Sequence, residues 1–300
     1  MAGNKDIDNL SPMEILLRNA AKSEEELIAI YKDAYIQILE RMQYNRVRKL
    51  NNRFLNALMA DIRGILTTLA SDSEEWINDN TPKLYKTGVG FATSSIKEFG
   101  VNDANFAKVN MSAIEILSAD FFDNLAMGIN NSGASLQTTL RQIALKSVQK
   151  NLILGKGTSG SAGEMYNDLL SNGLTSLRDR AGHSWNLMTY SSMVIRTKTR
   201  EIVTAGTVNT MVMAGDKYGG DGLFDLMQVS SHNGSCPICL PYQGKVYSIS
   251  GDSPNYPKLN KMTPFHPNCR HVLTPFFERL YKGNIDELRN FSNEGGQEDD

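Results

Sequence analysis

The side chains best suited to chemistry lie close together near the end of the chain. All three cysteines of the 300-residue sequence, and three of its four histidines, occur between residues 232 and 271. Cys236 and Cys239 are separated by two residues, and His266 and Cys269 repeat that spacing. On a tight turn such a spacing directs two ligands at one point, and a tetrahedral Zn2+ ion takes Cys and His ligands paired in this way. The spacing predicts a structural Zn2+ site formed by Cys236, Cys239, His266 and Cys269.

The fourth ligand has an alternative. His271 lies two residues after Cys269, so the two side chains point the same way if this segment is extended. The matched spacing favours His266, and His232 is a more distant candidate. A metal held by four protein ligands has no position open for water or substrate, which is typical of a structural site. Without a metal, these residues would be reduced, packed cysteines with hydrogen-bonded histidines.

The remaining motifs do not predict enzyme chemistry. Residues 155–160 match the G-x-G-x-x-G pattern, but no strand precedes them, so we interpret them as a flexible interhelical loop. A thioredoxin-type use of Cys236 and Cys239 would require a preceding βαβ pattern. A Cys–His nucleophile pair would need an orienting third residue, and none is identifiable. The sequence therefore indicates a protein that is not an enzyme.

The elements that must position the Cys and His residues fall into two parts. Apolar residues recur at three- and four-residue steps through much of residues 1–215, which predicts a helical body. Short β-type runs follow at 224–230, 245–249 and 271–276. An amphipathic piece and an acidic, disordered tail are expected at 283–300. The prediction is a mainly α protein, in which an extended helical body joins a small, loop-rich α+β module at 216–282 that zinc stabilises.

Polar residues and proline set the expected helix ends. The capping box at residues 23–26 predicts the start of a long helix that continues to Leu66. Residues 71–75 are expected to end this helix and to cap the next, which Pro82 kinks or restarts. Residues 130–133 predict a break between two later helices. A last long helix is expected at 184–213.

Composition excludes several classes of protein. The chain has 31 Lys and Arg against 33 Asp and Glu, a net charge of −2, so it is not a polycation that coats nucleic acid or membrane. It has no uninterrupted apolar run long enough to span a bilayer and no apolar signal segment at its start. An odd number of cysteines predicts no disulfide framework. The expectation is a protein of the reducing cytoplasm.

Two groups of basic residues require an interpretation. The first, on the long N-terminal helix, consists of Arg41, Arg46, Arg48, Lys49 and Arg53. It would suit phosphate contacts, although a solvated helix face is the more ordinary role. In the second, Arg196 and Arg200 lie four residues apart, a spacing that suits a carboxylate or phosphate clamp. Such a pair more often anchors a helix to its neighbour.

The sequence around the cysteines resembles a known family. The run Ser-His-Asn-Gly-Ser-Cys-Pro-Ile-Cys at 231–239 and the run His-Pro-Asn-Cys-Arg-His at 266–271 are similar to the tailed-phage minor capsid protein 2 family, which is related to the Mu F-like head morphogenesis proteins. The resemblance extends upstream to the basic segment at 196–200. It implies a virion component of low copy number, made beside the portal protein and without established enzyme activity. Because the family motif retains the position of His266 more regularly than that of His271, it also favours His266 as the ligand.

The resulting prediction is a minor structural protein of a tailed-phage head. It would act in procapsid assembly near the portal, through contacts with the portal protein and with the major capsid or scaffolding protein. Packaged DNA is a further candidate partner, and no membrane is expected. The protein would reside in the virion, in the head interior or near the portal, and in the host cytoplasm during assembly. The alternative is a zinc-dependent nucleic-acid-binding protein associated with packaged DNA.

Overall fold

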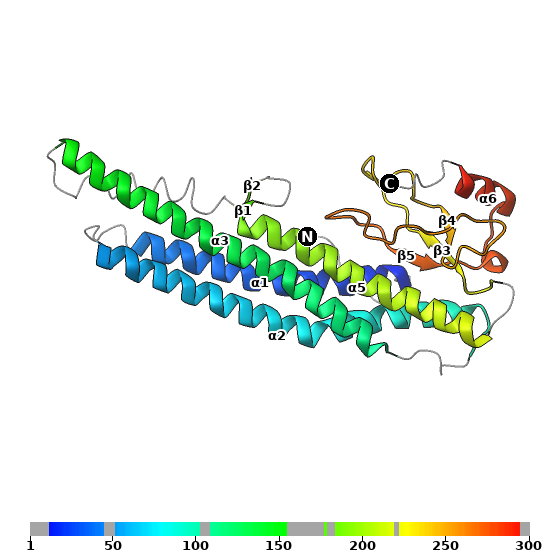
Figure 1. Ribbon diagram of the computed structural model, residues 1–300. Helices are drawn as coiled ribbons and strands as arrows, with labels where there is room; N and C mark the ends of the chain where they lie inside the picture. The colour runs from blue at the N-terminus through cyan, green and yellow to red at the C-terminus, as the bar shows by residue number, and fades with distance from the viewer. Residues whose placement is uncertain are drawn as a thin grey trace, which may run out of the picture. The chain divides into compact units, whose positions relative to one another are not determined.

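The structure is a computed structural model that describes residues 12–44, 52–102, 109–154, 177–178, 184–218 and 222–294. Its helices are α1 (Pro12–Tyr44), α2 (Asn52–Glu98), α3 (Met111–Leu154), α5 (Leu187–Tyr218), α6 (Ile285–Asn293) and the short 3-10 helix η4 (Glu278–Leu280). Its strands are β1 (Leu177–Arg178), β2 (Ser184–Trp185), β3 (Leu226–Val229), β4 (Val246–Ser248) and β5 (Leu273–Pro275) (Figure 1). The predicted fold class, mainly α with a small C-terminal β module, is confirmed.

The chain forms two compact units. The first comprises Met1–Glu24, Asp79–Ser118 and Arg196–Asp300, and the second comprises Glu25–Asn78 and Ala119–Ile195. Each of the four long helices therefore contributes residues to both units. The division of the chain at residues 215 and 282 stays a prediction.

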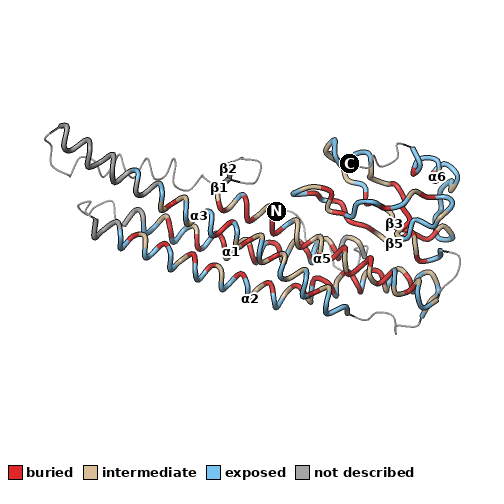
Figure 2. Tube along the Cα trace, in the orientation of Figure 1, coloured by how far each residue is buried: buried red, intermediate tan, exposed pale blue. Residues whose placement is uncertain are grey.

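Helices form the second unit by burying one side each. Figure 2 shows buried positions recurring along the helices, and the largest of those in this unit include Tyr31, Leu58, Leu69, Ile77 and Phe121. Trp76 meets the ring of Phe121 edge-on, with 6.4 Å between the centroids. The Ser73 hydroxyl donates to the carbonyl oxygen of Leu69 over 2.6 Å and lies 3.3 Å from the hydroxyl of Tyr31. A buried serine is therefore compatible with this helical core.

The helices are longer than their local signals predict. The expected single helix from residue 23 to Leu66 is wrong, because α1 already starts at Pro12 and ends at Tyr44, and α2 begins at Asn52. Four expected ends or breaks lie inside helices: residues 23–26 in α1, residues 71–75 and Pro82 in α2, and residues 130–133 in α3. In α2 the buried side chains continue on both sides of residues 71–75, so packing outweighs the local capping preference. The last predicted helix is confirmed as α5.

In the first unit, α2 and α5 approach closely at two glycines. A β-carbon added to Gly88 of α2 would overlap the carbonyl oxygen of Val203, and one added to Gly206 of α5 would overlap that of Tyr85. The Asn209 side chain donates to the Tyr85 hydroxyl over 2.8 Å at the same crossing. Glycine is needed at both positions because the two backbones are in contact.

The three predicted C-terminal strands are confirmed as an antiparallel sheet in the order β4-β3-β5. Met227 of β3 pairs with Tyr247 of β4 on one side and with Pro275 of β5 on the other. Met227 and Tyr247 belong to a buried cluster that also contains Ile96 of α2 and Met211 of α5. The sheet thus shares one hydrophobic core with the parts of α2 and α5 that belong to the first unit.

Helix α6 covers the outer edge of the sheet. Asn284 caps its start by accepting from the backbone N–H of Asp286 over 3.1 Å. Leu288 and Ser292 are buried, and the Ser292 hydroxyl accepts from the backbone N–H of Val246, in edge strand β4, over 3.0 Å. The predicted amphipathic piece is therefore a helix, and residues 295–300 of the expected acidic tail lie outside the described residues.

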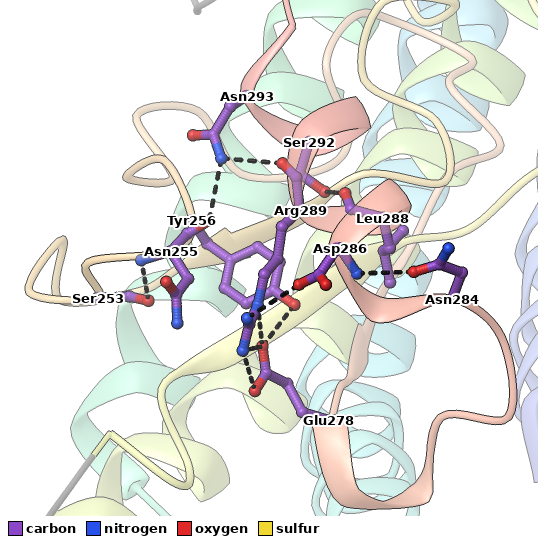
Figure 3. Close-up of polar contacts among 10 residues, drawn as sticks. All are labelled: Ser253, Asn255, Tyr256, Glu278, Asn284, Asp286, Leu288, Arg289, Ser292 and Asn293. Atoms are coloured by element: carbon purple, nitrogen blue, oxygen red, sulfur yellow. Dashed lines mark hydrogen bonds and ion pairs between the residues drawn. The ribbon is translucent and has the colours of Figure 1, made fainter.

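A polar network also holds α6 in place. Arg289 of α6 donates to the Glu278 carboxylate over 2.8 Å, and Tyr256 donates to the same carboxylate over 2.8 Å (Figure 3). The Asn293 amide donates to the backbone oxygen of Asn255 over 2.9 Å. These contacts join α6, η4 and the loop that follows β4. Within the described residues, no helix has the length and hydropathy needed to cross a membrane.

Candidate metal centre

Two short turns carry the predicted ligand pairs. In the first, the backbone N–H of Cys239 donates to the carbonyl oxygen of Cys236 over 3.0 Å. In the second, the N–H of Cys269 donates to the carbonyl oxygen of His266, also over 3.0 Å. Asn268 adopts a left-handed backbone with φ of 62°, which asparagine tolerates better than most residues. The equal spacing of the pairs therefore reflects the same kind of turn.

The turns and the strand that follows bring five potential ligands together. His266 Nε2 lies 3.1 Å from Cys236 Sγ and 3.0 Å from Cys239 Sγ. Cys269 Sγ lies 3.6 Å from Cys239 Sγ and 3.6 Å from His271 Nδ1. The atoms fall into two groups, Cys236–Cys239–His266 and Cys239–Cys269–His271, within each of which all lie within 4.8 Å of one another. Cys239 belongs to both groups, so the cluster is continuous.

The donor types suit a zinc ion, and part of their spacing does. Zn–S bonds of about 2.3 Å and Zn–N bonds of about 2.0 Å place two sulfurs about 3.8 Å apart, and a sulfur and a nitrogen about 3.5 Å apart, in a tetrahedral site. Cys239 Sγ lies 3.6 Å from Cys269 Sγ, close to the first value, and 3.0 Å from His266 Nε2, which is shorter than the second. His266 and Cys269 fall in different groups, so the four predicted ligands are not all within 4.8 Å of one another. The side chains of Cys239 and Cys269 are each only 1% exposed, so solvent does not compete for this side of the cluster.

Both histidines have a hydrogen-bond partner on the nitrogen that faces away from the thiols. His266 Nδ1 lies 2.7 Å from the carbonyl oxygen of Pro267, which can only accept, so Nδ1 is the donor and Nε2 is the nitrogen that faces the cysteines. His271 Nε2 lies 3.3 Å from Gln243 Oε1, and the other ring nitrogen, Nδ1, faces Cys269. Partners of this kind orient metal-binding imidazoles. Both histidines therefore fit, and the choice of His266 as the fourth ligand stays a prediction.

The electrostatics of the cluster act on metal binding in opposite directions. The backbone N–H of Cys239 lowers the pKa of the Cys236 thiol, whereas burial, followed by the neighbouring Cys269 thiol, raises the pKa of Cys239. A divalent metal would stabilise the thiolates and reverse the second effect. Burial, and then the positive charge that His232 and His266 can carry, lowers the pKa of His271 to about 4. His271 is therefore neutral at pH 7, the form that binds a metal.

Residues that the sequence reasoning missed form a polar layer around His271. The Ser235 hydroxyl lies 3.3 Å from His271 Nε2, and the side-chain oxygen of Gln243 accepts from the backbone N–H of His232 over 3.2 Å. The His232 ring, considered above as a distant ligand, packs edge-on against that of His271 with its Nε2 2.9 Å from the Ser230 hydroxyl. His232 is in neither group of potential ligands among the described residues. No spacing rule would have identified Ser235 or Gln243.

Helix α5 holds the second turn in place. Arg200 donates to the carbonyl oxygen of Cys269 over 3.1 Å and forms an ion pair with Glu24 of α1 at 3.4 Å. The Thr197 hydroxyl accepts from the backbone N–H of Asn268 over 3.2 Å. The spacing of Arg196 and Arg200 suggested a pair that anchors α5 to its neighbours. Arg200 has this role, whereas Arg196 is exposed. Arg200 links α1, α5 and the candidate metal centre.

Several predicted features lie outside the described residues. They are Arg46, Arg48 and Lys49 of the first basic group, and the glycine-rich segment at 155–160. Arg41 lies in α1 and Arg53 in α2.

Comparison with protein-family models matches residues 92–297 to the family described as phage minor capsid protein 2. The match covers more than half of the chain and includes all five potential ligands and the sheet that carries them. No curated protein and no solved structure matches the chain.

Proposed function

The chain belongs to the phage minor capsid protein 2 family, and on that premise we propose that it acts in procapsid assembly near the portal of a tailed-phage head. Its work would be contact with the portal protein and with the major capsid or scaffolding protein. The family is structural, so the proposed role requires no enzyme activity. We place the protein in the virion, in the head interior or near the portal, after assembly in the host cytoplasm.

We further propose that one Zn2+ ion stabilises the C-terminal module. Cys236, Cys239, His266 and Cys269 would hold it, with His271 as the alternative fourth ligand. The observation that supports this best is the convergence of two like turns on the buried sulfurs of Cys239 and Cys269. Structural zinc contributes about 10–16 kcal/mol to the folding of small domains, which is ample for a module whose strands have only three or four residues.

A fully coordinated ion would make the module rigid rather than reactive. With four protein ligands, the metal has no open position at which to activate water. The ion would link the turn after β3 to the turn before β5 and hold both on α5 through Arg200. A rigid module of this kind is suited to repeated protein–protein contact in an assembly, because few degrees of freedom are lost on binding.

The nucleic-acid alternative receives less support from the contacts. Arg200, half of the candidate phosphate clamp, already contacts Glu24 and the backbone of Cys269. A DNA-binding role would then depend mainly on the first basic group, only part of which lies among the described residues. It predicts affinity for DNA that falls steeply with salt.

Metal content and thiol reactivity of the same sample test the metal proposal. Protein purified without chelator should contain one zinc per chain, with its cysteines unreactive until the protein is denatured. His266→Ala should lose the metal, and His271→Ala should retain it. His232→Ala is the matched control, because His232 packs beside the cluster without belonging to either ligand group. Metal-free protein with three reactive thiols would reject the zinc site.

Assembly tests the rest of the proposal. Phage that lack the protein should yield fewer normal heads, and the purified protein should bind portal, capsid or scaffolding protein. Normal heads in its absence, together with no binding to any of these proteins, would contradict the proposed role. Salt-sensitive binding to DNA without such protein contacts would favour the alternative.

A further inference from the structure

A cavity of about 850 Å3 lies at the end of α5, apart from the cysteine cluster. Its wall is formed by the last turns of α5, by the segment leading into β3, and by the loop after β4, with Glu278 of η4 beside them. Tyr256 and Glu278, which also belong to the network that holds α6, line one side (Figure 3). We call this cavity the acidic pocket, for the charges described next.

The charged residues that line the acidic pocket are all negative. They are Asp216, Asp225, Asp252 and Glu278, and no lysine, arginine or histidine of the described segments lines it. Arg289 neutralises Glu278, but Asp225 accepts hydrogen bonds only from uncharged groups, such as the Ser250 backbone N–H over 2.7 Å. Among the described residues, no cation contacts Asp216 or Asp252. The C-terminal end of the α5 dipole adds partial negative charge at the same place.

The pocket also exposes apolar side chains. Val212 and Leu223 are each 41% exposed, while Met211 and Phe224 line it from buried positions. Unpaired carboxylates repel anions, and the apolar surface gains nothing from a small hydrated cation. The combination suits a ligand with an apolar body and positively charged ends.

We propose that the acidic pocket binds a basic segment of another virion protein, in which lysine or arginine residues flank a Leu, Ile or Phe side chain. The apolar side chain would cover Val212 and Leu223, and the cations would approach Asp216 and Asp252. This inference rests on the proposed function in one respect, which is that the basic segment belongs to another protein of the virion. It does not depend on the metal centre, because none of the five potential metal ligands lines the pocket.

Peptide binding by the full chain tests the inference. The probes are short, overlapping, fluorescently labelled peptides that cover the portal, major capsid and scaffolding proteins of the same phage, together with peptides from this chain. Binding is measured by fluorescence anisotropy. The pocket variant is the double change Asp216→Asn and Asp252→Asn, which preserves side-chain shape. The matched control is Asp72→Asn with Asp79→Asn, the same charge change at exposed positions of α2 outside the pocket.

We expect the tightest-binding peptides to be basic and to contain a large apolar residue. Their affinity should fall about tenfold or more in the pocket variant, fall with added salt, and change less than about twofold in the control. Val212→Ser should also weaken binding, at unchanged charge. The inference is overturned if no peptide binds, if the bound peptides are not basic, if pocket and control variants behave alike, or if peptides from this chain bind best. Each of these failures would leave zinc content and head incorporation, which test the proposed function, unaffected.

Discussion

Two glycines of α2 that look equivalent in the sequence should respond to alanine in opposite ways. Gly88 is buried against the backbone of α5, where an added β-carbon would overlap the carbonyl oxygen of Val203 and lie 2.9 Å from the backbone nitrogen of Thr207. Gly90 is exposed, and an added β-carbon would have nothing within 4 Å. Both are helix-interior positions, so both variants gain the same intrinsic helix propensity, about 1 kcal/mol.

The cost at Gly88 follows from what surrounds it. Val203 and Thr207 are each 1% exposed. The added β-carbon would contact their backbone atoms, which cannot rotate away as a side chain could. The helices must therefore separate, and a gap of about 1 Å forfeits about a quarter to a half of the dispersion energy of the atoms across it. Overpacking costs about 1–3 kcal/mol, and more where backbone is involved. Gly88→Ala should lose about 2–3 kcal/mol of stability, and Gly90→Ala should gain about 0.5–1 kcal/mol.

Thermal unfolding followed by far-UV circular dichroism measures the difference. At about 2–4 °C per kcal/mol, the Tm of Gly88→Ala should fall by about 4–12 °C and that of Gly90→Ala should rise by about 1–4 °C. Gly206→Ala, on the other side of the crossing, should resemble Gly88→Ala. Equal Tm values for the Gly88 and Gly90 variants would refute the close approach of the two helices.

Three other outcomes are expected. Removing the metal with a chelator should make the C-terminal module protease-sensitive while most helical circular dichroism remains, and unchanged protease resistance would argue against a stabilising metal. Arg200→Met should cost about 2–4 kcal/mol in urea unfolding, because it removes the ion pair with the buried Glu24 and the hydrogen bond to the carbonyl oxygen of Cys269; Arg196→Met, at an exposed position, should change little. Ser292→Ala should cost about 1–2 kcal/mol by leaving the N–H of Val246 unpaired and should speed hydrogen exchange in β4; unchanged exchange there would contradict the contact.

The sequence predicted those features that depend on local pattern. The β-type runs at 224–230, 245–249 and 271–276 each contain a strand, because alternation and flanking turn residues are properties of a few neighbouring positions. The spacing of the two ligand pairs likewise identified two turns. That Cys236, Cys239, His266 and Cys269 hold one ion was an inference from chemistry and stays a prediction; the structure places them, with His271, in two groups that share Cys239.

The features that the sequence did not predict depend on distant contacts. Ser73 resembles a helix cap, yet it is buried inside α2 because Leu69 and Tyr31 satisfy its hydroxyl. The spacing of Arg200 suggested an anchoring role, but only the fold shows that it meets Glu24, which lies 176 residues away in the sequence. Gln243 and Ser235 take their places beside His271 through the path of the chain, which residue spacing does not encode.

The interleaving of the two compact units has a consequence for synthesis on the ribosome. The first unit needs residues from both ends of the chain, and the 176 residues between Glu24 and Arg200 take about 9–35 s to translate at about 5–20 residues per second. During that time Glu24 has been made but Arg200, with which it forms an ion pair, has not. Any nascent chain that stops before α5 therefore lacks a completed first unit, and no single cut releases either unit whole. The first unit can therefore be completed only late in the translation of the chain.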